Sequence, residues 1–105
     1  SLRSAMNRQV AEARSYEATA APLIVTKVEV TSVNRGSVIA EAMVEFNNAI
    51  CLQGVRLLKK RDGGDWVSPP SDKRGAEWVN HARFSNELEE QIMRAIKAEL
   101  DRTRR

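Results

Sequence analysis

The residues best suited to chemistry in this chain are cations, which gather within the stretch Val55–Arg74. An apolar run leads there into three consecutive cations, and a further pair follows a short aromatic segment and two prolines. These cations are Lys59, Lys60 and Arg61, then Lys73 and Arg74. Cations clustered at turns beside a sheet can replace the counterions of a polyanion. The stretch therefore predicts phosphate contact, with a solvated surface that only keeps the protein soluble as the alternative.

The positive charge of the chain is concentrated around this stretch. The 105 residues include 17 cations and 14 anions, a net charge of +3. Residues 47–84 alone carry seven cations against four anions, whereas residues 85–105 carry five of each. The excess therefore lies in the turn-rich middle of the chain, where a polyanion is expected to bind.

The two tryptophans are a second set of candidates. Trp66 and Trp78 could stack on unpaired bases, but a tryptophan in a small domain is more often part of the core. We therefore expect both to be buried. If one of them is exposed beside Lys73 and Arg74, Trp78 is the better candidate.

Catalytic and metal chemistry have little support in this sequence. His81 is the only histidine, and no Cys or carboxylate at ligand spacing completes a site, so we expect neither metal nor cofactor. Cys51 could pair with His81 as a nucleophile, but it lies among apolar residues and is expected to be a buried structural thiol. Asp62 and Asp65 flank a Gly-Gly pair and are explained by turn chemistry. Without a phosphate-binding glycine loop, serine elbow or carboxylate pair, the sequence predicts no enzyme and no small-molecule substrate.

The composition also bears on location. No apolar run approaches the roughly 20 residues of a membrane-spanning helix, and no basic-then-apolar leader is visible. A single cysteine is typical of a reducing compartment. We therefore expect a cytoplasmic protein with no membrane partner.

Hydrophobic patterning predicts strands that would position the cations. The strands are expected over residues 24–33, 37–46, 49–60, 66–68 and 77–81. Hairpin turns are expected at Asn34–Gly36 and Asn47–Asn48. The third strand is apolar on both faces and is expected to be central, with a bulge at Gly54. Pro69 and Pro70 lack ladder donors and should end the fourth strand.

A helix is expected after Phe84, with Ser85 or Asn86 as its N-cap. Its apolar face is formed by Leu88, Ile92, Ala95, Ile96 and Leu100. Residues 1–22 are Ala-rich and are expected to form a helical arm or linker that Pro22 ends. The sequence thus predicts an α+β fold: a small antiparallel sheet of about four to five strands with a C-terminal helix packed on it, in a domain over 23–105 behind an N-terminal helical arm.

The order of several short motifs carries a family resemblance. The motifs are Val44-Glu45-Phe46, Val55-Arg56-Leu57, Trp66–Ser71, Lys73-Arg74 and the Ile-x-x-Ala-Ile pattern of Ile92–Ile96. In this order, behind an alternating Val-rich strand and a hairpin, they resemble the stage V sporulation protein G (SpoVG, septation protein) family. The resemblance covers about 70 of the 105 residues, from Ile24 to Ile96.

The resemblance implies an antiparallel sheet with a C-terminal helix and a homodimer formed by pairing sheet edges. It further implies a bacterial DNA- and RNA-binding regulator of transcription, septation or sporulation, which acts by occupying its site. The basic residues implicated are Lys73, Arg74 and Arg83. The chain departs from the family pattern at the apparent insertion of Asp72, in its more basic Lys59–Arg61 run, and in its arm over residues 1–21.

A protein-interaction module is the alternative to nucleic-acid binding. In that case the sheet edge or the N-terminal arm would dock a partner chain, and the cations would only confer solubility. The two alternatives differ in whether binding depends on phosphate and on salt.

Overall fold

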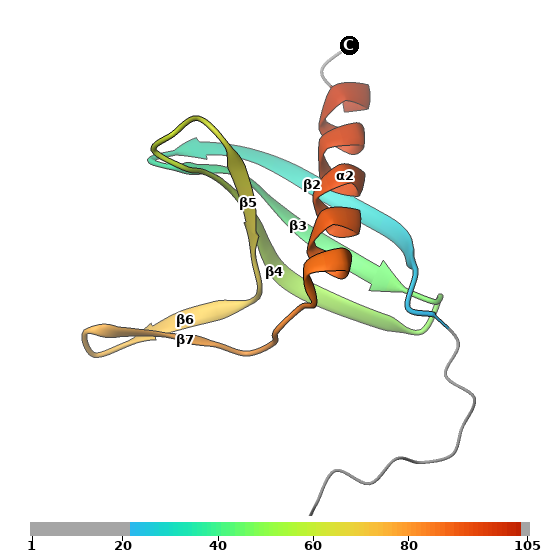
Figure 1. Ribbon diagram of the computed structural model, residues 1–105, viewed down its shortest axis with the longest axis horizontal. Helices are drawn as coiled ribbons and strands as arrows, with labels where there is room; N and C mark the ends of the chain where they lie inside the picture. The colour runs from blue at the N-terminus through green and yellow to red at the C-terminus, as the bar shows by residue number, and fades with distance from the viewer. Residues whose placement is uncertain (1–21, 104–105) are drawn as a thin grey trace, which may run out of the picture.

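The computed structural model describes residues 22–103, so the arm expected over 1–22 lies almost wholly outside the described residues. Within that range the chain forms a four-stranded antiparallel sheet, a separate two-stranded hairpin and one helix (Figure 1). The elements are β2 (Val25–Arg35), β3 (Val38–Phe46), β4 (Ile50–Lys59), β5 (Asp65–Ser68), β6 (Ser71–Arg74), β7 (Glu77–Asn80) and α2 (Asn86–Thr103). The predicted α+β class, with an antiparallel sheet and a C-terminal helix, is confirmed.

The sheet is a simple meander in the order β2-β3-β4-β5, so β4 is central as predicted. Asn47 and Asn48 both have a φ of 53°, which suits a tight hairpin turn because Asn tolerates the left-handed region. Gly54 has a φ of 84°, and between the pairs Ala42–Val55 and Val44–Leu52 the strand β4 has one residue more than β3. The expected bulge at Gly54 is therefore confirmed.

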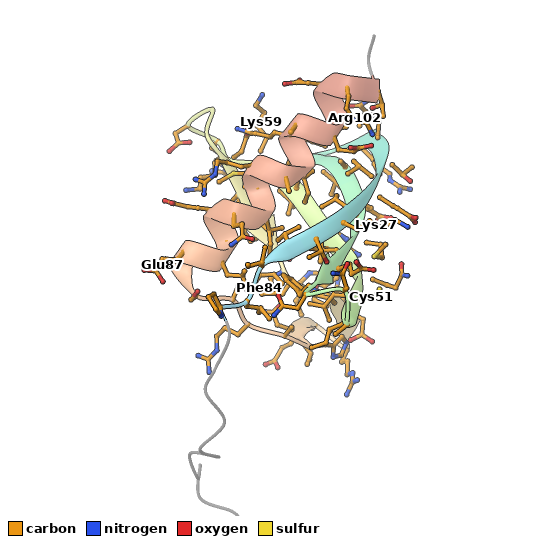
Figure 2. The ribbon with its side chains drawn as sticks, turned by 90° about the vertical axis from the view of Figure 1, so that its right-hand side faces the viewer. Lys27, Cys51, Lys59, Phe84, Glu87 and Arg102 are labelled. Carbon is orange, nitrogen blue, oxygen red and sulfur yellow. The ribbon has the colours of Figure 1, made fainter. Side chains whose placement is uncertain are left out.

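One face of the sheet is covered by α2 and holds the core (Figures 1 and 2). Every second residue of β3 is buried there, which the alternation of the sequence predicts. The buried apolar residues of the sheet are Ala40, Ala42, Val44, Phe46, Val55, Leu57 and Val67. Those of the helix are Ile92, Ile96 and Leu100. The opposite face is not covered by a helix in residues 22–103 and is touched by the β6–β7 hairpin where Trp78 contacts Arg56; Figure 2 shows Lys27 and Cys51 on that side.

Two polar contacts fix the first turns of the helix. The Ser85 hydroxyl accepts a hydrogen bond from the Leu88 amide at 3.1 Å, so Ser85 is the N-cap of the two candidates. The Gln91 side chain accepts a hydrogen bond from the Val25 amide at 2.6 Å. The N-terminal part of α2 is thereby joined to the beginning of β2, an edge strand of the sheet.

The β6–β7 hairpin differs from the sequence prediction, which has a single short strand after the prolines. Ser71–Arg74 pairs with Glu77–Asn80 around Gly75, whose φ is 64°. The base is closed where the Pro70 carbonyl accepts a hydrogen bond from the His81 amide at 2.7 Å. The segment Ser-Asp-Lys-Arg has no β-branched or aromatic residue, so its strand character comes from pairing and not from propensity.

Truncating Ile96 to alanine tests the one-sided core. The Ile96 side chain is fully buried between helix and sheet, and removing its methylenes should lower the free energy of unfolding by about 2–5 kcal/mol. Urea denaturation followed by circular dichroism measures the change. The exposed Arg94 on the same helix supplies the control, because Arg94→Ala should alter stability by less than about 0.5 kcal/mol. Equal effects of the two substitutions would contradict this account of the core.

Candidate nucleic-acid interface

The β4–β5 turn presents the first group of predicted cations. Lys59, Lys60 and Arg61 are all exposed, and Figure 2 shows Lys59 beside the C-terminal half of α2. The turn is tied internally, because the Asp62 carboxylate accepts a hydrogen bond from the Gly64 amide at 2.8 Å and the Gly64 carbonyl accepts one from the Lys60 amide at 2.6 Å. This occupies Asp62 in shaping the turn, as predicted.

Arg35 joins these cations and was not identified from the sequence. It ends β2, and the Ser37 carbonyl two residues later accepts a hydrogen bond from the Lys59 amide at 2.8 Å. In a meander the first and third turns lie at the same end of the sheet, so the strand order alone could have placed Arg35 there. We call Arg35, Lys59, Lys60 and Arg61 the sheet-end cluster.

Lys73 and Arg74 form a second group, the hairpin cluster, in a different place from the one predicted. From the sequence, both groups are expected on turns at one end of the sheet. Instead, the two residues end strand β6 of the hairpin, which follows β5, whereas the sheet-end cluster precedes β5 (Figure 1). Strand β5, the two prolines and the first half of β6 lie between the two clusters along the chain, because Pro69 and Pro70 end β5 and the chain enters a new pair of strands.

The predicted contact residues differ from one another in whether they form a salt bridge. Within residues 22–103, the Arg74 guanidinium forms a salt bridge with Asp72 at 3.5 Å, and the imidazole of His81 lies 3.2 Å from the same carboxylate. The cations without a salt bridge inside that range include Arg35, Lys59, Lys60, Arg61, Lys73 and Arg83. Arg83 is exposed in the connection between β7 and α2, outside both clusters. Most of the predicted contact residues thus form no salt bridge within the described range, although the hydrogen bond from Lys97 and, to a lesser extent, the charge of Lys59 lower the pKa of the Asp65 carboxyl.

The prediction that both tryptophans are buried is wrong. Trp66 is 41% exposed and Trp78 is 59% exposed. Trp66 precedes Val67, which is buried under the helix, so alternation directs Trp66 to the uncovered face. Trp78 lies in the hairpin, where it is the cross-strand partner of Lys73. The expectation that Trp78 is the better candidate for an exposed position beside the basic pair is therefore confirmed.

Cys51 and His81, which could form a nucleophile pair according to the sequence, contact two different carboxylates. The prediction that Cys51 is buried is wrong: Cys51 is the cross-strand partner of Glu45 on the face opposite the helix, and its thiol is exposed. The Cys51 sulfur lies 3.9 Å from the Glu45 carboxylate, while His81 contacts Asp72. In the described part of the chain no three His, Cys, Asp or Glu side chains are grouped to hold a metal ion.

Asp65 and Lys97 form the shortest link between the β4–β5 turn region and the helix. Their charged atoms lie 2.7 Å apart, and the Asp65 side chain is mostly buried. The hydrogen bond from Lys97 lowers the pKa of the Asp65 carboxyl below its ordinary value, partly opposed by burial. Both residues line a pocket of about 500 Å³ beside Leu57 and Leu100. This pair holds α2 against the end of the sheet that carries the sheet-end cluster.

Replacing Lys97 with methionine tests that link through its pH dependence. A lowered pKa stabilises the fold at pH values above about 4, the value of an unfolded Asp, and this contribution disappears as pH falls through the folded pKa. Lys97→Met should therefore cost about 1 kcal/mol at pH 7 and much less near pH 3, measured by urea denaturation. Arg94→Met, which removes a more exposed pair, is the control. A loss that is the same at both pH values would contradict the ion-pair assignment.

Comparison with known proteins does not assign the chain to a family. No protein-family model matches the chain, and no curated protein is significantly similar to it. The resemblance to septation proteins thus stays a prediction based on the order of motifs. Over residues 22–103, no helix has the apolar length that crossing a membrane requires.

Proposed function

We propose that this protein is a nucleic-acid-binding regulator, similar to the septation proteins, that acts by occupying DNA or RNA and not by catalysis. One observation carries the proposal: exposed cations in the β4–β5 turn and at the end of β6, most of them without a salt bridge among residues 22–103. Lysine and arginine in this state release condensed counterions when they bind phosphates, which gives most of the affinity of such complexes.

The order of elements supports the same proposal. The antiparallel sheet followed by a C-terminal helix is the architecture that the resemblance implies, and the basic pair Lys73–Arg74 lies on an exposed hairpin. The core uses only the other face of the sheet. Apart from Arg74, which pairs with Asp72, the cations of the two clusters form no salt bridge in the described fold and are available for binding.

Reversing the charge of either cluster should weaken binding. We expect Lys73→Glu/Arg74→Glu and Lys59→Glu/Lys60→Glu each to lower the affinity for nucleic acid at least tenfold. Each pair should also reduce the slope of log affinity against log salt by up to about 2, because two phosphate contacts are lost. Fluorescence anisotropy with labelled duplex DNA, single-stranded DNA and RNA at several salt concentrations measures both quantities.

A matched control separates position from net charge. Lys27→Glu/Arg94→Glu makes the same change of charge at exposed residues away from both clusters, and should alter affinity by only a small factor. If this control weakens binding as much as the cluster variants, the interface is wrongly assigned. If the unaltered protein binds none of the three nucleic acids at low salt, the proposed function is wrong. The protein-interaction module is then the alternative to test.

We further propose that two copies pair through β2. This eleven-residue strand forms one edge of the sheet, and a long unpaired edge is a template for another strand. Leu23 and Ile24, immediately before β2, are 45% and 51% exposed. A homodimer would present two copies of each cluster to one nucleic acid and raise affinity through bivalency.

Sedimentation velocity tests the dimer. We expect a particle of twice the 11.8 kDa chain mass, and we expect Leu23→Glu/Ile24→Glu to shift it to the monomer by placing charges at the proposed contact. Ala98→Glu, on the exposed side of α2, should leave the mass unchanged. A monomer in the unaltered protein at micromolar concentration would contradict the pairing.

A further inference from the structure

Two exposed tryptophans lie along the route between the two cation clusters. Trp66 is the second residue of β5, and on β4 its cross-strand neighbour is Leu58. Trp78 is paired with Lys73 in the hairpin. The two tryptophan side chains thus lie between the sheet-end cluster and the hairpin cluster.

Arg56 lies on β4 between Trp78, which it contacts, and Leu58, which is the cross-strand partner of Trp66. Its neighbours Val55 and Leu57 are buried under the helix, so Arg56 and Leu58 both face the uncovered side, roughly 7 Å apart along the strand. The Arg56 guanidinium lies 5.7 Å from the centre of the Trp78 ring, a distance suited to a cation–π contact. We call Trp66, Leu58, Arg56 and Trp78 the aromatic strip.

The distribution of charge on the uncovered face favours binding of a polyanion along this strip. The same uncovered face continues across β3 and β2, but there it carries three carboxylates. The carboxylates are Glu29, Glu41 and Glu45, and Lys27, a cation beside them, pairs with Glu29 at 3.3 Å. Glu41 also pairs with Arg56 at 3.7 Å, so Arg56 contributes mainly as a flat stacking partner. A phosphate backbone is repelled from the β2–β3 half of the face and attracted to cations at both ends of the strip.

Tryptophan rings that are open to solvent bind a base through its flat surface. In a duplex these surfaces are covered by neighbouring base pairs, so an exposed ring gains little from double-stranded nucleic acid. An unpaired strand offers one free surface after another, and stacking on aromatic side chains tolerates any sequence. An exposed pair of rings between cation clusters therefore favours unpaired over paired nucleic acid.

We propose that the aromatic strip binds an unpaired stretch of nucleic acid, with bases stacked on Trp78 and Trp66 and phosphates held by Lys73 and the sheet-end cluster. This proposal rests on the proposed function and names its ligand more closely. Trp78 is the more exposed ring, and it contributes the larger part of the stacking.

Alanine and phenylalanine variants test the strip. Trp78→Ala should lower the affinity for single-stranded DNA and RNA roughly 5- to 150-fold and change duplex affinity less than about twofold. The salt slope should stay unchanged because no phosphate contact is removed. Trp78→Phe should keep most of the affinity, and Trp66→Ala should show a smaller loss. Binding of unlabelled oligonucleotide should also quench the tryptophan fluorescence of the unaltered protein.

Met43→Ala is the matched control, since Met43 is an apolar residue of the same uncovered face on its acidic half. It should leave all affinities unchanged. Parallel single-stranded DNA and RNA of one sequence show whether the ribose hydroxyl contributes.

The outcomes separate this inference from the proposed function. If single-stranded and duplex affinities fall equally, or if Trp78→Ala changes neither, the strip does not stack on bases and only this inference is overturned. The same holds if Trp78→Ala changes the sedimenting mass, because the strip is then a contact between copies. If the unaltered protein binds no nucleic acid, both proposals fail.

Discussion

The packing of one helix on one sheet face is the constraint on which the rest of this structure depends. Ile92, Ile96 and Leu100 of α2 are buried in one cluster with Ala40 and Val44 of β3, and no helix of residues 22–103 covers the other face. A domain of this size buries only about two-thirds of its surface, so it has little apolar sequence left for a second layer. Large aromatic and cationic side chains are consequently left exposed.

The same one-sided packing explains how the candidate interface is arranged. Cations need no core, so they occupy turns and a projecting hairpin, where their ammonium and guanidinium groups stay hydrated until a phosphate replaces the water. Lys97 is an exception among the cations, because its bond to Asp65 serves the attachment of the helix. Binding and folding therefore draw on largely separate sets of residues, and the binding residues can be changed without large effects on stability.

The sequence predicts the parts of the fold that follow from periodicity. The alternation in β3, the helical face of α2 and the Asn47–Asn48 turn are all as expected, because each depends on neighbours within a few residues. Strand β6 was missed because its residues favour a strand only when β7 is present to pair with them. The exposure of Trp66 and Trp78 could not be predicted either, since a local pattern shows which residues share a face but not which face a helix will cover.

The attachment of the β6–β7 hairpin affects how stable the hairpin is relative to the sheet. Two four-residue strands are marginal by themselves, and β6–β7 is held at its base by the Pro70–His81 bond and at its side by the Arg56–Trp78 contact. Its amide protons should therefore exchange with solvent through local opening, well before those of β3, which open only with the whole domain. The element that carries Lys73 is thus a separate cooperative unit, whose order a bound ligand would increase.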